Sequence, residues 1–82
     1  MYTVYILYSE SIQKFYCGQT NSIENRLIKH NNHEVKSTKH GAPWKIVWTN
    51  LLLSRSDAMN LEETIKKRGI KRWMIDNLIK LE

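Results

Sequence analysis

Two tyrosines, an arginine and a histidine lie in the first third of the chain. Tyr5 and Tyr16 each stand in a short aromatic strand motif, and Arg26 and His30 follow on a predicted helix. Phenol and imidazole groups can activate water, and a guanidinium can bind two phosphate oxygens at once. Because residues four apart share one helix face, Arg26 and His30 project from the same side. These residue types favour the hydrolysis of a phosphodiester bond.

The strands that must position the tyrosines are indicated by alternating aromatic and β-branched residues. This alternation predicts strands over residues 2–8, 15–20 and 44–49, the first of them covered on both faces. The polar segment over residues 9–14 predicts a hairpin loop, so the first two strands are antiparallel. Gly18, inside the second strand, marks either a bulge or a close approach by another group.

Three helices complete the predicted fold. The first begins at Asn21 and ends at Asn31 and Asn32. The second begins at Ser54 or Ser56 and ends near Lys67, and the third runs from Arg72 to Leu81. Glu24 stands three residues after Asn21, which is the spacing of a capping box. The order β-β-α-β-α-α predicts an α+β fold, with a small three-stranded antiparallel sheet flanked by helices. We expect a single domain over residues 1–82.

One acidic side chain of the second helix points toward the predicted core. The helix buries an apolar arc formed by Ala58, Met59, Leu61 and Ile65. At about 100° per residue, Glu62 projects inside this arc, whereas Glu63 projects outside it toward solvent. A buried carboxylate needs a strong partner. Glu62 is therefore a candidate either for an ion pair with a neighbouring Lys or Arg or for a metal site.

The chain is basic and shows no pattern of a secreted or membrane protein. Its 13 Lys and Arg against 8 Asp and Glu give a net charge of +5, which attracts nucleic acid first and an anionic membrane second. No apolar run approaches the roughly 20 residues of a membrane helix, and the N-terminus lacks a signal-peptide pattern. Cys17 is the only cysteine, which excludes an internal disulfide and fits a reducing compartment. We expect a cytoplasmic protein without a membrane partner.

Five segments carry these side chains in order along the chain. They are Thr3-Val4-Tyr5-Ile6-Leu7, Phe15-Tyr16-Cys17-Gly18-Gln19-Thr20, Ile23-Glu24-Asn25-Arg26-Leu27-Ile28-Lys29-His30, Gly41-Ala42-Pro43-Trp44 and Asp57-Ala58-Met59-Asn60-Leu61-Glu62-Glu63-Thr64-Ile65-Lys66-Lys67. The ordered set resembles the GIY-YIG nuclease superfamily, in particular its compact single-domain members, over nearly the whole chain. Thr3-Val4 replaces the name-giving Gly-Ile of the first motif, and Cys17 occupies the variable middle of the second. Neither departure removes a reactive side chain.

The resemblance implies a role for each matching residue. Tyr5 and Tyr16 match the motif tyrosines that line the active site, and we expect Tyr5 to deprotonate the attacking water or to hold it in line. Arg26 matches the arginine that contacts the scissile phosphate, and His30 the residue that assists proton transfer or tunes the tyrosine. Glu62 matches the carboxylate that holds one divalent metal ion, Mg²⁺ or Mn²⁺. One carboxylate suffices because Mg²⁺ keeps most of its waters.

The sequence thus indicates a metal-dependent DNA endonuclease that works by a one-metal, tyrosine-assisted mechanism. The expected phosphate contacts are Lys29, Lys39, Lys66 and Lys67. Tyr2 and Tyr8 lie outside the motif positions and are predicted to pack. Two other classes stay open: a catalytically weak or inactive nucleic-acid-binding module with the same fold, and a structural domain whose charge is incidental.

The substrate is less well defined than the chemistry. DNA is the expected nucleic acid, with RNA as the alternative. Branched, nicked or damaged DNA would each suit a nuclease of this size, and damaged DNA would place it in DNA repair. We expect a monomer or a weak homodimer.

Overall fold

The chain folds in the predicted order of strands and helices. The structure, a computed structural model, describes residues 1–80. Its elements are β1 (Tyr2–Ser9), β2 (Lys14–Thr20), α1 (Ile23–Asn31), β3 (Trp44–Leu52), α2 (Arg55–Arg68) and α3 (Ile70–Asp76). This order confirms the α+β fold. Among residues 1–80, no helix is both long enough and apolar enough to cross a bilayer.

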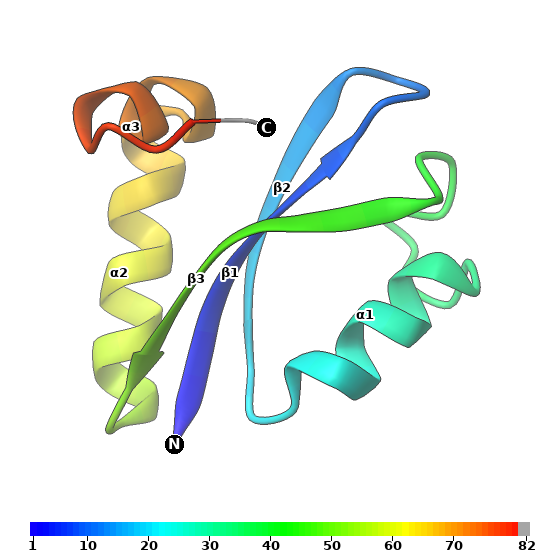
Figure 1. The fold of residues 1–82 in the computed structure, drawn as a ribbon. Helices are drawn as coiled ribbons and strands as arrows, with labels where there is room; N and C mark the ends of the chain where they lie inside the picture. The colour runs from blue at the N-terminus through cyan, green and yellow to red at the C-terminus, as the bar shows by residue number, and fades with distance from the viewer. Residues whose placement is uncertain (81–82) are drawn as a thin grey trace.

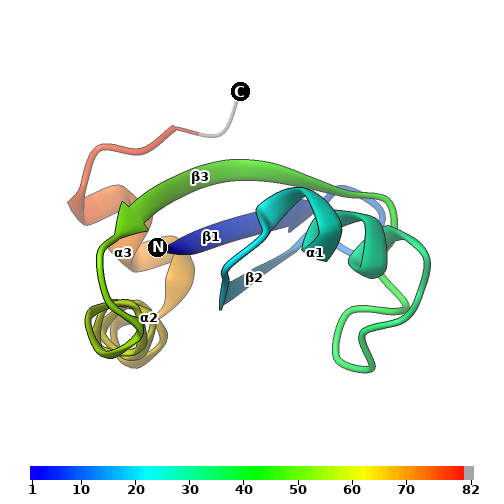
Figure 2. The same ribbon diagram turned by 90° about the horizontal axis from the view of Figure 1, so that it is seen from below.

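β1 is the central strand of a three-stranded antiparallel sheet with the order β2-β1-β3. Helix α1 lies on one side of the sheet, and α2 and α3 lie on the other (Figure 1; Figure 2). In the register of β1 with β2, Tyr5 is opposite Gly18 and Leu7 is opposite Tyr16. Since alternate residues of a strand share a face, Tyr5 and Tyr16 both lie on the α1 side.

Successive side chains of β1 enter two different hydrophobic layers. The layer between the sheet and helices α2 and α3 contains Val4, Ile6 and Cys17 of the strands and Ala58, Ile65 and Met74 of the helices. The layer on the α1 side contains Tyr5, Leu7 and Trp44, with Ile23 and Leu27 of α1 packed against it. Residues 4–7 are all buried, which confirms that the first strand is covered on both faces.

Two predicted boundaries in the first part of the chain are wrong, and the backbone contacts explain why. β3 is longer than predicted, because β1 offers it pairing partners as far as Tyr2, which lies opposite Leu52. Helix α1 begins after Ser22 rather than after Asn21, and no side chain caps it. The Ser22 N–H donates a hydrogen bond to Thr20 Oγ1. The predicted capping box is therefore absent.

The last helix also begins earlier than predicted. Gly69 ends α2 with a φ of +96° and serves at once as the cap of α3, which spans Ile70–Asp76. Leu78 is 87% exposed, whereas Ile79 packs against the core. Leu81, the predicted end of the helix, lies outside the described residues.

Helix α2 carries the predicted carboxylate inward. Ser54 Oγ accepts a hydrogen bond from the Asp57 N–H and caps the helix, as predicted. The Glu62 side chain is 19% exposed and that of Glu63 is 67% exposed, which confirms the orientation expected from helical spacing. Met59 is exposed, so the apolar arc is narrower than predicted.

Candidate active site

Gly18 allows the Tyr5 ring to lie across the neighbouring strand. A Cβ atom at Gly18 would stand 2.6 Å from Tyr5 Oη and 3.0 Å from Tyr16 Cε2. The absence of a side chain leaves room for both phenols on one face, with ring centroids 6.3 Å apart. Of the two predicted meanings of Gly18, close approach is correct. The register shift in the sheet lies elsewhere, between Ile6 and Leu7.

His30 reaches the Tyr5 hydroxyl from α1. Its Nε2 lies 2.9 Å from Tyr5 Oη, and its Nδ1 lies 2.7 Å from Thr38 Oγ1. The Thr38 hydroxyl donates to the Val35 carbonyl, which leaves its oxygen to accept from the Nδ1–H of His30. Nε2 then carries no proton and accepts the hydrogen of the Tyr5 hydroxyl. Trp44 Nε1–H donates to the Thr38 carbonyl and holds the loop in place.

Burial keeps both members of this pair neutral. The Tyr5 and His30 side chains are almost completely buried. Burial raises the pKa of Tyr5 to about 12, although hydrogen bonding from Arg26 opposes the shift. Burial and, after it, the charge of Arg26 lower the pKa of His30 to about 4. At neutral pH the site therefore holds a phenol bonded to a neutral imidazole, the form of histidine that accepts protons.

Arg26 lies beside both tyrosine hydroxyls. Hydrogen bonding to Tyr5 raises the pKa of Arg26, and Tyr16 makes a smaller contribution in the same direction. Arg26 Nε is buried and finds no hydrogen-bond partner within residues 1–80. Leaving such a donor unpaired costs about 1–3 kcal/mol. An anion that binds the guanidinium would offset part of this cost, and a phosphate matches its fork of donors.

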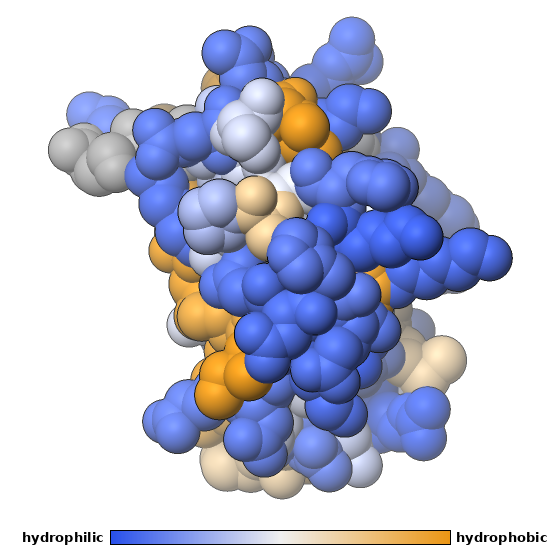
Figure 3. Space-filling view, turned by 90° about the vertical axis from the view of Figure 1, so that its right-hand side faces the viewer, coloured by the Kyte–Doolittle hydropathy of each residue, from blue (hydrophilic) through white to orange (hydrophobic). Residues whose placement is uncertain are grey.

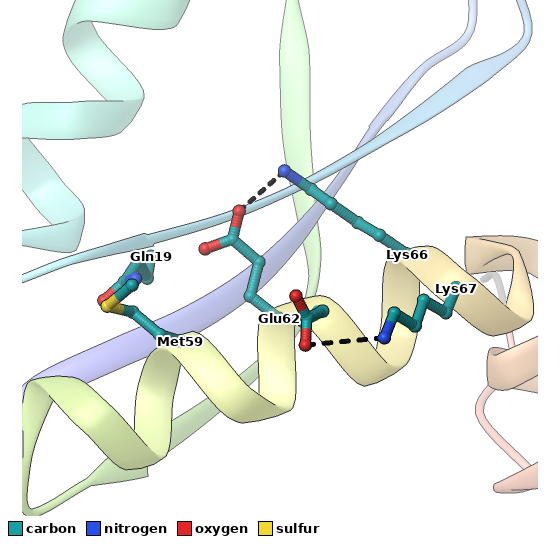
Figure 4. Close-up of a pocket in the computed structure, with 6 residues that line it drawn as sticks. Gln19, Met59, Glu62, Lys66 and Lys67 are labelled. Carbon is teal, nitrogen blue, oxygen red and sulfur yellow. Dashed lines mark ion pairs between the residues drawn. The ribbon is translucent and has the colours of Figure 1, made fainter.

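Glu62 approaches β2 from the opposite side. Its Oε2 lies 2.6 Å from Lys66 Nζ, one turn farther along α2. Figure 4 shows the other carboxylate oxygen directed away from Lys66, on the side of Gln19. Together with Met59, Glu63 and Lys67, these residues line an open pocket of about 420 Å³. One oxygen of Glu62 thus remains for a further ligand.

Lys66 connects this pocket with the tyrosines. Its Nζ lies 5.9 Å from the centre of the Tyr16 ring. Through this contact the candidate site extends around the β2 edge, with the α1 side chains on one side and the α2 side chains on the other.

Cys17 of β2 is not a nucleophile at neutral pH, because burial, and after it the charge of Glu62, raises the pKa of its thiol to about 12.

The sequence of the candidate site matches one protein family. The family model described as the GIY-YIG catalytic domain matches residues 1–73. The chain belongs to the GIY-YIG family. Its match includes every residue of the candidate site, and membership indicates a nuclease-type function on nucleic acid. No curated protein and no solved structure matches the chain significantly.

The GIY-YIG site offers few protein ligands to a metal ion. Within the part of the chain that the structure describes, no three His, Cys, Asp or Glu side chains form a metal-binding group. An ion beside Glu62 would have one carboxylate oxygen from the protein, with the Gln19 side chain at the wall of the same pocket. Water and substrate oxygens would complete its coordination, an arrangement that Mg²⁺ accepts. The residues present fit such an ion if it uses the oxygen that Lys66 leaves free.

The four lysines predicted to contact phosphates lie at three places of the GIY-YIG domain: on α1, in the loop before β3 and on α2. Lys29 is exposed on α1 and lines a small pocket together with Arg26. Figure 3 shows that hydrophilic side chains cover most of this face. Lys39 is exposed in the loop before β3. Lys66 and Lys67 each form an ion pair with the glutamate one turn earlier, at 2.6 and 3.7 Å. Their phosphate contacts stay predictions.

Two neighbours of the GIY-YIG residues could not be found from the sequence. Thr38 holds the Nδ1 of His30, yet it belongs to a polar loop without periodicity or motif. Gln19 lines the pocket beside Glu62, and nothing in the strand pattern indicates that α2 approaches it. Both contacts depend on tertiary packing: that of Thr38 on the path of the loop before β3, and that of Gln19 on the packing of α2 against β2.

Proposed function

We propose that the protein is a metal-dependent DNA endonuclease that uses one divalent metal ion and tyrosine-assisted hydrolysis, acting as a single domain over residues 1–82. The observation that carries the proposal is the buried Tyr5–His30 pair, with Oη and Nε2 2.9 Å apart beside Arg26. A domain that only binds nucleic acid does not need a buried phenol bonded to a neutral imidazole. Membership of a nuclease family supports the same function.

Tyr5 serves as the base through His30. As the attacking water gives a proton to Tyr5 Oη, the hydroxyl proton of Tyr5 passes to His30 Nε2, so no free phenolate forms. In the free protein, pKa values of about 12 for Tyr5 and about 4 for His30 keep the proton on Tyr5. A bound phosphate offsets the charge of Arg26, which holds the pKa of His30 down. Substrate binding therefore makes His30 a stronger base.

Arg26 and Glu62 act on the charge of the phosphate from opposite sides of β2. Arg26 can bind two phosphate oxygens and stabilise the negative charge that grows in the transition state. Glu62 would hold Mg²⁺ or Mn²⁺, which supplies Lewis-acid stabilisation for the leaving oxygen. Tyr16, whose ring centroid lies 5.1 Å from that of His30, packs beside the base. The expected backbone contacts are Lys29, Lys39, Lys66 and Lys67.

A nucleic-acid-binding module without useful catalysis is the second candidate. The observation that favours it is the Glu62–Lys66 ion pair, because it gives the inward carboxylate a partner without any metal. Such a module would bind DNA in a salt-sensitive manner and cleave nothing.

The deciding experiment incubates the purified protein with supercoiled plasmid, single-stranded DNA, branched DNA and RNA, in Mg²⁺, in Mn²⁺ or in EDTA. We expect nicking of DNA that requires a metal ion and is abolished by EDTA. Salt-sensitive binding without cleavage under either metal would reject the endonuclease in favour of the binding module. A cytoplasmic location and a monomer or weak homodimer stay predictions, to be checked by fractionation and by light scattering.

A further inference from the structure

A second pocket lies where β1 turns into β2, away from the candidate active site. It measures about 370 Å³ and is lined by Tyr8, Gln13, Lys14, Phe15 and Lys71. Tyr8 and Phe15 pair across the two strands, with ring centroids 4.8 Å apart and ring planes inclined by 44°. Both residues are half-buried, so the rings pack together and still present surface to the pocket. Tyr8 packs as the sequence predicts, and part of its ring also faces the pocket.

This pocket shares a lining lysine with a neighbouring groove, which in turn shares lining lysines with the pocket beside Glu62. Lys71 lines both the second pocket and a groove at the junction of α2 and α3. Lys66 and Lys67 line both that groove and the pocket of Glu62. Figure 1 shows α3 at the same end of the sheet as the β1–β2 turn. The three neighbouring hollows, which lie on the α2–α3 side of the sheet, are here together named the β2 track.

The β2 track is long enough for several nucleotides. Phe15 and Gln19 lie on the same face of β2, and four residues of strand span about 13 Å. A stacked DNA strand rises about 3.4 Å per nucleotide. At most about four nucleotides, and fewer in an extended strand, therefore separate the pocket of Glu62 from the Tyr8–Phe15 pair.

The cations at the aromatic end of the β2 track are available to phosphates. Lys14 and Lys71 are exposed, and neither belongs to any ion pair formed among residues 1–80. Aromatic rings flanked by cations suit a single strand, because the bases stack on the rings while the phosphates meet the charges. A duplex offers no such base, since its bases already stack on one another.

We infer that the β2 track binds an unpaired DNA strand that leaves the cleavage site, with a base stacked on the Tyr8–Phe15 pair and phosphates bound by Lys14 and Lys71. The inference rests on the proposed function for the chemistry at the other end of the track. It names the substrate class as a DNA duplex that carries a single-stranded tail.

Binding measured in EDTA separates this inference from cleavage. Fluorescence anisotropy would compare a blunt duplex with duplexes that carry a 5′ or a 3′ tail of about six nucleotides, longer than the track. We expect one tailed duplex to bind at least about fivefold more tightly than the blunt one, the contribution of a single stacked base. Tyr8→Leu/Phe15→Leu, which keeps apolar volume in the sheet, should abolish this preference.

A second pair of variants tests the track without changing side chains that pack against the core, as Phe15 does. Lys14→Ala/Lys71→Ala removes two exposed charges from the track and should also reduce the preference for the tail. Lys36→Ala/Lys80→Ala removes the same charge from exposed positions outside the track and should preserve it. Equal binding of blunt and tailed duplexes by the unaltered protein would overturn the inference, as would a preference that survives in both track variants.

Failure of the inference and failure of the proposed function give different results. A protein that prefers tailed DNA but cleaves nothing supports the β2 track and rejects the endonuclease. A protein that cleaves DNA but shows no preference for a tail rejects the track and supports the endonuclease.

Discussion

The Tyr5 hydroxyl lies 2.9 Å from His30 Nε2, and both side chains are buried. The contact joins β1 to α1. Thr38 bonds the second ring nitrogen of His30, so the imidazole cannot turn away from the phenol without losing a hydrogen bond. The two hydrogen bonds therefore fix the orientation of the imidazole toward the phenol before any substrate binds, which is the preorganisation that the proposed mechanism requires.

Removal of the Tyr5 hydroxyl should stop the chemistry and spare the fold. We expect Tyr5→Phe to lower the nicking rate by at least about 100-fold, the lower end for loss of a general base. The ring still packs, and leaving the buried His30 Nε2 without a partner costs about 1–3 kcal/mol of stability. Nicking rate and DNA affinity would be measured together. Tyr2→Phe is the matched control, because Tyr2 packs on the other side of the sheet; an equal loss in both variants would contradict the role of Tyr5.

A methyl group at Gly18 should act on the same hydroxyl. In Gly18→Ala the new Cβ would stand 2.6 Å from Tyr5 Oη, so the phenol must move away from His30. We expect a stability loss of about 1–3 kcal/mol from overpacking, together with a large fall in nicking rate. Thermal unfolding and nicking would be compared in a double-mutant cycle with Tyr5→Phe. The double variant should lose little more activity than either single variant, and additive losses would show that Gly18 acts elsewhere.

The two adjacent glutamates of α2 provide a matched test of the metal site. Glu62→Gln removes the inward charge, whereas Glu63→Gln removes an outward charge from the same turn. We expect Glu62→Gln to abolish nicking across a titration of Mg²⁺ or Mn²⁺ and Glu63→Gln to retain it, because the Glu62 side chain is 19% exposed and turned toward the sheet, whereas that of Glu63 is 67% exposed and turned toward solvent. Similar activity in the two variants would show that Glu62 binds no catalytic metal.

Lys66 should compete with a metal ion for Glu62. Its ammonium lies 2.6 Å from Oε2, where it partly neutralises the carboxylate. We expect Lys66→Met to raise the affinity for Mn²⁺ about fivefold, which corresponds to about 1 kcal/mol for a partly exposed ion pair. Electron paramagnetic resonance of free Mn²⁺, recorded without DNA, measures this change. Unchanged affinity in Lys66→Met would mean that the ion does not use this carboxylate.

Acid should destabilise the protein through His30. Burial lowers the pKa of His30 from 6.5 to about 4. Between these values the unfolded chain takes up a proton that the folded chain refuses, so stability falls as the pH drops through this window and is independent of His30 above it. Each pKa unit corresponds to about 1.4 kcal/mol, so a shift from 6.5 to about 4 sets an upper bound of about 3.5 kcal/mol, less where water screens the charge.

The measurement for this prediction is thermal unfolding across the window, together with the ring resonances of His30. We expect those resonances to stay unchanged until the pH falls toward 4. Titration of His30 near its ordinary pKa of 6.5 would show that the imidazole is more accessible to water than the structure indicates.

The sequence by itself determined the type and order of the elements. The alternation in β1 and the spacing of apolar residues in α2 are local properties of the backbone, and they predict which faces are buried. They were sufficient to place Tyr5 and Tyr16 on adjacent strands and to turn Glu62, rather than Glu63, inward. The predicted cap of α1 and the predicted start of α3 were wrong: the Ser22 N–H bonds the Thr20 hydroxyl, and Gly69 both ends α2 and begins α3.

Only the tertiary structure decided which side chains meet. Tyr5 and His30 are 25 residues apart, and their contact depends on the packing of α1 against the sheet. Thr38 comes from a loop whose path no periodicity predicts. Burial then changes the chemistry of the pair: the same side chains have ordinary pKa values of 10.0 and 6.5, and the fold moves them to about 12 and about 4. Residue types are local, whereas proximity and exclusion of water arise only when the whole chain has folded.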